Sequence, residues 1–137
     1  MMILSTEMQR LNEIFNLCFI VNKKTDLAVT FDYEGYNDRA IFTIYKNKNL
    51  HKEKIITVLK KHINLKSERF LSCSDSKEMI KSTKLIKEIL ASIIDNIEFH
   101  NRKHIKLDTE KIIKNLIETF PDDISDEVKN AINNIEK

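Results

Sequence analysis

The chain has 137 residues, of which 42% are hydrophobic and 32% charged, and its formal net charge is +2 at pH 7. This length suits one domain that buries its own core without disulfides or a structural metal, and we treat residues 1–137 as that domain. A net charge this small excludes any argument for nucleic-acid binding from overall charge alone.

The composition also bears on where the protein works. Isoleucine, lysine and asparagine are abundant, and all three use AT-rich codons, which indicates a low-GC bacterial or phage genome. The two cysteines, Cys18 and Cys73, fit no metal-ligand spacing and are typical of a reducing cytosol. The opening MMILSTEMQR lacks the pattern of a signal peptide, and no apolar run is long enough to span a membrane. We therefore expect a cytoplasmic protein that makes no membrane contact.

The N-terminal part predicts a helix followed by a β-hairpin. Residues 5–22 carry apolar side chains at helical spacing, at positions 8, 11, 14, 15, 18 and 19. From Leu27 onward the apolar period changes to two, which is typical of strands. The chain reverses at EGYND, where Gly35 permits a tight turn. One face of this hairpin should pack on the helix.

The segments after the hairpin are less regular. Residues 49–65 have apolar side chains at 55, 56, 59 and 63, and this spacing predicts a second helix. Residues 66–74 fit either a short third strand or a loop. Together, residues 1–65 form a helix–hairpin–helix unit in this interpretation.

Residues 75–137 predict a helical unit. A capping-box pattern at Asp75 opens a long helix that runs to about Arg102. Asp108 is expected to cap the next helix, Pro121 to end it, and Ser125 to Ile135 to form the last one. The fold class is therefore α+β, with a small antiparallel sheet and a mainly helical C-terminal half.

Several kinds of catalytic site lack support in the sequence. With a single glycine there is neither a GxGxxG pattern nor a Walker A loop. His100 and His104 stand four residues apart, as zinc ligands on one helix face do, but no further ligand has a matching spacing. The alternative is that both histidines lie at a helix end, where imidazolium suits the dipole. We expect no enzyme, no cofactor and no metal.

Charge is distributed unevenly along the chain. Residues 46–66 contain seven lysines and one acid, and their candidates for phosphate contact are Lys46, Lys48, Lys52, Lys54, Lys60 and Lys61. The alternative is a solvated basic face. An acidic stretch at residues 118–127 could imitate phosphate against a basic groove through Asp122, Asp123, Asp126 and Glu127. Its alternative is a junction between helices, where acids favour helix N-termini.

All three tyrosines lie on or beside the hairpin. Tyr33, Tyr36 and Tyr45, together with Arg39, are residue types enriched at interface hot spots. They predict a protein-binding site, unless Tyr33 and Tyr45 merely cover the sheet.

The hairpin carries a family resemblance. The stretch VTFDYEGYNDRAIFTIYKN, preceded by LNEIFNLCFIVNKKTDL, resembles a group of small proteins from phages and mobile elements of low-GC Gram-positive bacteria. The resemblance covers roughly residues 10–63 and implies a helix, a hairpin and a helix. Anti-CRISPR inhibitors, most of them non-enzymatic, come from the same genomic neighbourhoods. No site residues can be carried over from this group.

These observations predict a non-enzymatic binding protein of phage or mobile-element origin. Its expected partner is a host protein or ribonucleoprotein complex, such as a CRISPR effector that it inhibits. The alternative function is a small nucleic-acid-binding or regulatory protein that uses residues 46–66. A homodimer through the long helix at 76–102 is also compatible with the sequence, because its apolar positions extend around much of the helix.

Overall fold

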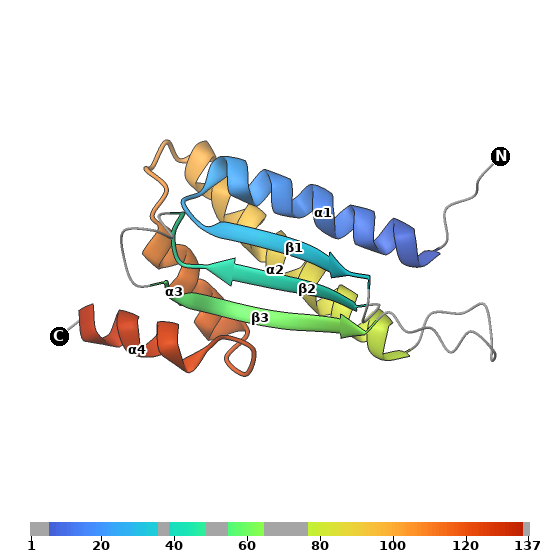
Figure 1. Cartoon of the computed structure of the whole chain (residues 1–137). Coiled ribbons are helices and arrows are strands. Elements are labelled where there is room, and N and C mark those ends of the chain that lie inside the picture. The colour runs from blue at the N-terminus through green and yellow to red at the C-terminus, as the bar shows by residue number, and fades with distance from the viewer. Residues whose placement is uncertain (1–5, 36–38, 49–54, 65–76, 136–137) are drawn as a thin grey trace, which may run out of the picture.

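The computed structural model describes residues 6–35, 39–48, 55–64 and 77–135. A three-stranded antiparallel sheet forms one layer, and helices lie on one of its faces (Figure 1). The elements in chain order are α1 (Thr6–Lys24), β1 (Ala28–Glu34), β2 (Arg39–Tyr45), β3 (Thr57–Asn64), α2 (Lys77–Arg102), α3 (Thr109–Thr119) and α4 (Asp126–Ile135). The predicted α+β class, the N-terminal helix, the hairpin and the long helix are confirmed.

The strand β3 replaces the helix that the sequence predicted at 49–65, and that prediction was wrong. The apolar positions 55, 59 and 63 match helical spacing, but Leu59 and Ile63 also alternate with exposed Lys60 and His62. Pairing with β2 favours the strand over the helix, because a strand at this position bonds to the N–H and C=O groups on the side of β2 that faces away from β1. Residues 49–54, and the short strand or loop considered at 66–74, lie outside the described residues.

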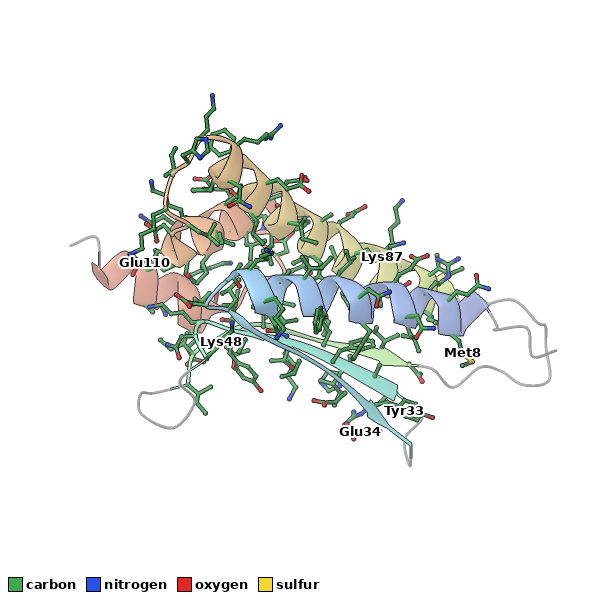
Figure 2. All side chains as sticks on the ribbon, turned by 90° about the horizontal axis from the view of Figure 1, so that it is seen from above. Met8, Tyr33, Glu34, Lys48, Lys87 and Glu110 are labelled. Atoms are coloured by element: carbon green, nitrogen blue, oxygen red, sulfur yellow. The ribbon has the colours of Figure 1, made fainter. Side chains whose placement is uncertain are left out.

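The register of the sheet separates a buried face from an open one. On the buried face, Val29, Ile44 and Leu59 are neighbours across the three strands. The apolar period of two in the hairpin predicted that Val29 and Ile44 would face the core. On the other face Ile41 and Tyr45 are only half-buried. Viewed from above, α1 and α2 lie on one side of the sheet, and none of the described helices covers the other side (Figure 2).

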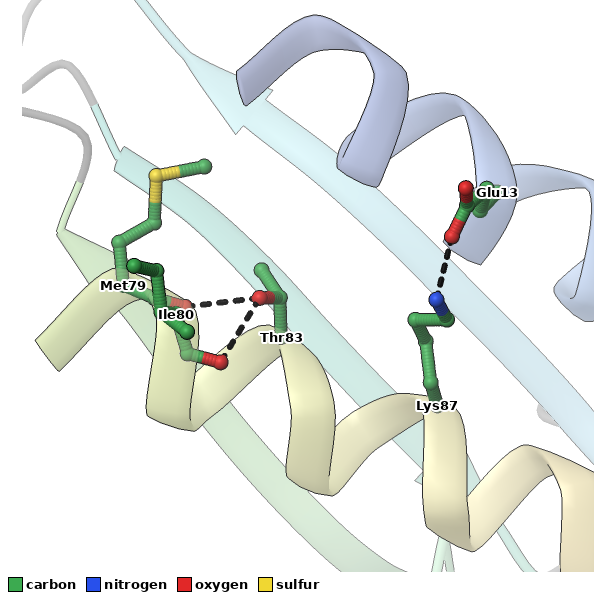
Figure 3. A network of polar contacts seen from close by, with 5 residues as sticks. All are labelled: Glu13, Met79, Ile80, Thr83 and Lys87. Carbon is green, nitrogen blue, oxygen red and sulfur yellow. Dashed lines mark hydrogen bonds and ion pairs between the residues drawn. The ribbon is translucent and has the colours of Figure 1, made fainter. Parts of the chain in front are cut away.

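Helices α1 and α2 pack against each other over the buried face of the sheet. The core side of α2 supplies Ile86, Leu90 and Ile93, all with 0% exposure. Lys87 forms an ion pair with Glu13 of α1 (Figure 3), and this hydrogen bond holds the pKa of the Glu13 carboxyl below its usual value. Figure 3 also shows the Thr83 hydroxyl bonded back to the main chain of its own helix, at Met79 and Ile80.

The C-terminal helices begin at side-chain caps, of which the one at Asp108 was predicted from the sequence. The Asp108 carboxylate accepts a 3.0 Å hydrogen bond from the Glu110 N–H at the start of α3, and α3 ends at Thr119, two residues before Pro121. Ser125 caps α4 by accepting from the Val128 N–H at 3.2 Å. The Ser125 N–H also donates to the Val58 carbonyl oxygen at 2.8 Å, which attaches the start of α4 to β3.

Candidate functional site

The hairpin residues predicted as one binding cluster are not gathered in one place. Tyr33 is paired with Ala40 and lies on the helix side of the sheet, near the turn. Tyr45 is paired with Ala28 at the opposite end of the hairpin and on the opposite face. Tyr36 lies outside the described residues. Of the three described members, Tyr33 is the one with a largely exposed side chain, at 64%.

Arg39 is held by an ion pair within the hairpin. Its Nη2 lies 2.9 Å from Glu34 Oε1, and its Nε donates to the same oxygen at 3.0 Å. Glu34 and Arg39 are direct cross-strand partners next to the turn, so this contact stabilises the hairpin. A partner that used Arg39 would have to share its guanidinium with Glu34.

The predicted acidic surface is divided by a long-range ion pair. Lys61 Nζ lies 2.6 Å from Asp123 Oδ1, so Asp123 helps to attach the α3–α4 connection to β3. Asp122, Asp126 and Glu127 are exposed, and the last two lie in the first turn of α4. Their position supports the alternative of acids that favour a helix N-terminus.

The predicted basic segment points in several directions. Lys48 donates to the main-chain oxygens of Asn22 and Thr25, at 2.7 Å for Thr25, and so satisfies carbonyls at the end of α1 (Figure 2). Lys60 is exposed on the open face of the sheet, whereas Lys61 is on the buried side and bonds Asp123. Lys46 is half-buried, and Lys52 and Lys54 lie outside the described residues. The described lysines therefore do not line one phosphate-binding face.

His100 and His104 do not share a helix face. The main chain leaves the helix at His104, whose φ of 54° is in the left-handed region. The Ile105 N–H donates to the His100 carbonyl at 3.0 Å and the His104 N–H donates to the Asn101 carbonyl at 3.2 Å, which is a Schellman motif. His100 is buried, and its Nδ1 lies 2.8 Å from the Asn96 carbonyl oxygen. No group of three or more metal-ligating side chains occurs within the described ranges.

This geometry makes a prediction for His104. Glycine adopts a positive φ without the steric cost that a side chain pays, so His104→Gly should raise the free energy of unfolding by about 0.5–1 kcal/mol. Urea denaturation followed by circular dichroism measures the change. Lys103→Gly, one residue earlier and without a positive φ, should destabilise instead. If added zinc raised the melting temperature of the parent chain but not that of His104→Gly, the metal hypothesis would be restored.

Cys18 is a core residue. Its side chain is 5% exposed, and burial raises the pKa of the thiol to about 12. Burial and a protonated thiol at neutral pH both disfavour a nucleophilic role for Cys18.

A row of exposed apolar side chains runs along α1. Phe15 is 60% exposed, Phe19 is 58% exposed and Met8 is 48% exposed. They lie on one side of the helix, beside the buried positions Ile14 and Cys18. The sequence pattern had placed all of them in one core-facing stripe. The apolar positions of α1 span a wide arc of the helix, and this width indicates that a single packing face cannot bury all of them.

Tyr33 extends this row from the helix onto the sheet. Helix α1 contacts β1 and runs antiparallel to it, so the N-terminal part of α1 lies beside the end of β1 (Figure 1). Figure 2 shows Met8 and Tyr33 at this same end of the molecule. We call Met8, Phe15, Phe19 and Tyr33 the apolar row. It borders β1, which is an edge strand.

Asn22 marks where this edge is closed. Its Nδ2 donates to the Val29 carbonyl oxygen at 2.8 Å, and its Oδ1 accepts from the Val29 N–H at 2.7 Å. The side-chain amide thus replaces a neighbouring strand at one residue of β1. Nearby, Lys23 Nζ lies 5.5 Å from the Phe19 ring centroid, within the range of a cation–π contact.

Shallow hollows also occur on the described surface, and we consider two of them. One, of about 460 Å³, lies at the start of α3 and is mostly polar, with Asp26, Asp108 and Lys111 in its lining. The other, of about 390 Å³, lies between α1 and α2 over Leu17 and Ala91. Both are open to solvent, and neither collects a set of groups that would act together on a substrate.

Comparison with known proteins adds no relative. No protein-family model, no curated protein and no solved structure matches this chain. Among the helices in the described ranges, none combines the length and apolar character needed to cross a membrane.

Proposed function

We propose that this protein is a non-enzymatic binding protein of phage or mobile-element origin that inhibits a host defence effector, of the kind that anti-CRISPR proteins inhibit. The observation that carries the binding role is the apolar row, whose four side chains are each 48–64% exposed. Contiguous exposed apolar side chains on a small protein mark an interaction surface. The phage origin and the effector as partner rest on the resemblance of residues 10–63.

The apolar row has the character of a binding hot spot. Three of its four members are aromatic, and aromatic side chains supply a large contact area for a small loss of rotamer freedom. All four project from regular elements, so their positions are set before a partner binds. Tyr33 thus keeps the role that the sequence suggested, while Phe15 and Phe19 replace Tyr45 and Arg39 as its companions.

The alternative function, nucleic-acid binding through residues 46–66, has less support. Lys48 is engaged with the end of α1 and Lys61 with Asp123, and the exposed Lys60 is on the other face of the sheet. Dispersed lysines of this kind do not line a path along a phosphate backbone.

A target-cleavage assay tests the proposal. Purified CRISPR effector complexes of several types would cleave a labelled DNA target in the presence of this protein. We expect this protein to protect the DNA target from at least one of these effectors. Phe19→Asp should lower the inhibitory potency by about 100-fold, because a hot-spot side chain contributes binding free energy of this order. Phe99→Asp is the matched control, since Phe99 is 47% exposed and belongs to α2, which contributes no member of the apolar row.

Two results would contradict the proposal. One is full cleavage by every effector at saturating protein. The other is equal loss of inhibition in Phe19→Asp and Phe99→Asp while both variants keep the thermal stability of the parent.

A further inference from the structure

The hollow between α1 and α2 combines apolar residues with basic ones. Its volume is about 390 Å³, and the apolar residues in its lining are Leu17, Ile80 and Ala91. Leu17 is half-buried, whereas Ile80 and Ala91 are exposed. Sites for small ligands have volumes of about 300–1,000 Å³ and present apolar surface with a few polar groups that orient the ligand. The hollow has this size and this composition.

Positive charge predominates around the hollow. Arg10, Lys84 and Lys87 belong to its lining, and among the described lining residues Glu88 is the one acid. Lys87 is engaged with Glu13 of α1 (Figure 3). Lys84 is exposed, and no carboxylate among the described residues forms an ion pair with it. An anionic ligand can therefore reach Lys84 without displacing an ion pair between described residues.

The two helices give the hollow a direction. Helices α1 and α2 run the same way (Figure 1), so Arg10 and Lys84 lie toward one end, and Leu17 and Ala91 toward the other. From Lys84 to Ala91 the helix rises by about 10 Å. An extended ten-carbon chain measures about 12 Å, because each C–C bond of about 1.5 Å advances it by about 1.3 Å. A fatty-acid anion of this length matches the distance between the basic end and the apolar end.

The volume favours such a slender ligand over a helix of a partner protein. A helix with its side chains is about 10–12 Å across, so one turn of about 5.4 Å occupies roughly 400 Å³. A single helical turn would fill the hollow. A hydrocarbon chain needs less room, and the methylene groups of Lys84 and Lys87 can pack along it.

We propose that the hollow between α1 and α2 binds the anion of a free medium-chain fatty acid. The carboxylate lies beside Lys84 and Arg10, and the hydrocarbon chain covers Leu17 and Ala91. This site goes beyond the proposed function, and its lining includes no member of the apolar row.

Titration with sodium decanoate, followed by amide proton–nitrogen correlation spectra, tests the site. Below the concentration at which decanoate forms micelles, we expect saturable shifts of the Leu17 and Ala91 amides, with a dissociation constant of about 1 mM or less. The Thr30 and Thr43 amides, paired in the sheet, should not shift. Hexanoate should bind about 10-fold more weakly, because each partly buried CH₂ contributes about twofold. Decylammonium, of opposite charge, should show no saturable binding.

Substitutions separate the charge from the apolar lining. Lys84→Glu should weaken decanoate binding by about 10-fold or more, because it replaces attraction by repulsion. Lys60→Glu is the matched control, since Lys60 is exposed on the open face of the sheet and its replacement changes the net charge equally. Ala91→Glu should also weaken binding by about 10-fold, because it places a carboxylate where the hydrocarbon chain lies. All three positions are exposed, so circular dichroism should give melting temperatures close to that of the parent.

Several results would overturn the inference. These are the absence of saturable shifts, equal binding of decylammonium, an equal loss of affinity in Lys84→Glu and Lys60→Glu, and shifts confined to the apolar row. Binding of the chain to vesicles of anionic phospholipid, without binding of free decanoate, would assign the hollow to a membrane surface and would also overturn it. The cleavage assay contains no decanoate, so either proposal can fail while the other holds.

Discussion

Phe42→Ala should lower the free energy of unfolding by about 3–5 kcal/mol. Phe42 has 0% exposure at the centre of β2, where its neighbours across the sheet are Phe31 and Lys61. Removing the ring leaves a cavity between the sheet and the helices that surrounding atoms fill only partly. Urea denaturation followed by circular dichroism measures the loss, which is a large part of the 5–15 kcal/mol typical of a domain.

The adjacent residue supplies the control for Phe42. Ile41 is on the same strand but faces away from the helices and is only half-buried. Ile41→Ala should therefore cost about 1 kcal/mol, less than half the effect at Phe42. Equal losses at both positions would mean that the open face of the sheet is covered in solution.

Asn22→Asp should destabilise the fold by about 2–3 kcal/mol. The carboxylate can still accept from the Val29 N–H, but it has no N–H to donate to the Val29 carbonyl oxygen, so two acceptors face each other. The new negative charge also lies in the last turn of α1, where the helix dipole disfavours it. The change in the urea midpoint measures this effect.

Asn16→Asp separates the geometry at Asn22 from the charge that both substitutions add. Asn16 is exposed in the middle of α1, so its replacement should change stability by no more than about 0.5 kcal/mol. If Asn22→Asp were equally mild, the double hydrogen bond to Val29 would not contribute to closing the edge of β1.

Local patterns predicted much of the fold. The helical period before Lys24, the change to period two at the hairpin and the cap at Asp108 each depend on neighbours in the sequence, and each is present in the structure. The strand β3 was missed because the spacing of Ile55, Leu59 and Ile63 fits a helix as well as a strand. The strand is favoured over the helix because it pairs with β2, and this tertiary contact cannot be read from the local pattern.

The candidate site was less predictable, because it depends on which apolar residues remain uncovered. Tyr33 was singled out by its residue type, whereas Phe15 and Phe19 had the same pattern as the core residues of α1. Charge clusters in the sequence were misleading for a related reason. Lys61 and Asp123 are 62 residues apart, and their pairing removes one member from each predicted charged surface. The role of Asn22 at the sheet edge has no sequence signature at all.

The attachment of α4 gives the two margins of the sheet different properties. The main chain of β3 bonds to Ser125 at Thr57 and Val58, and the exposed Lys60 follows on the same strand. Natural sheets use such covered and lysine-bearing margins to resist the addition of further strands. At the opposite margin, the Asn22 side chain closes β1 at Val29, so each edge strand carries a side chain or a main-chain contact that occupies part of it. We expect both contacts to oppose the addition of strands from neighbouring molecules, which protects the protein from sheet-to-sheet aggregation at high concentration in a cell.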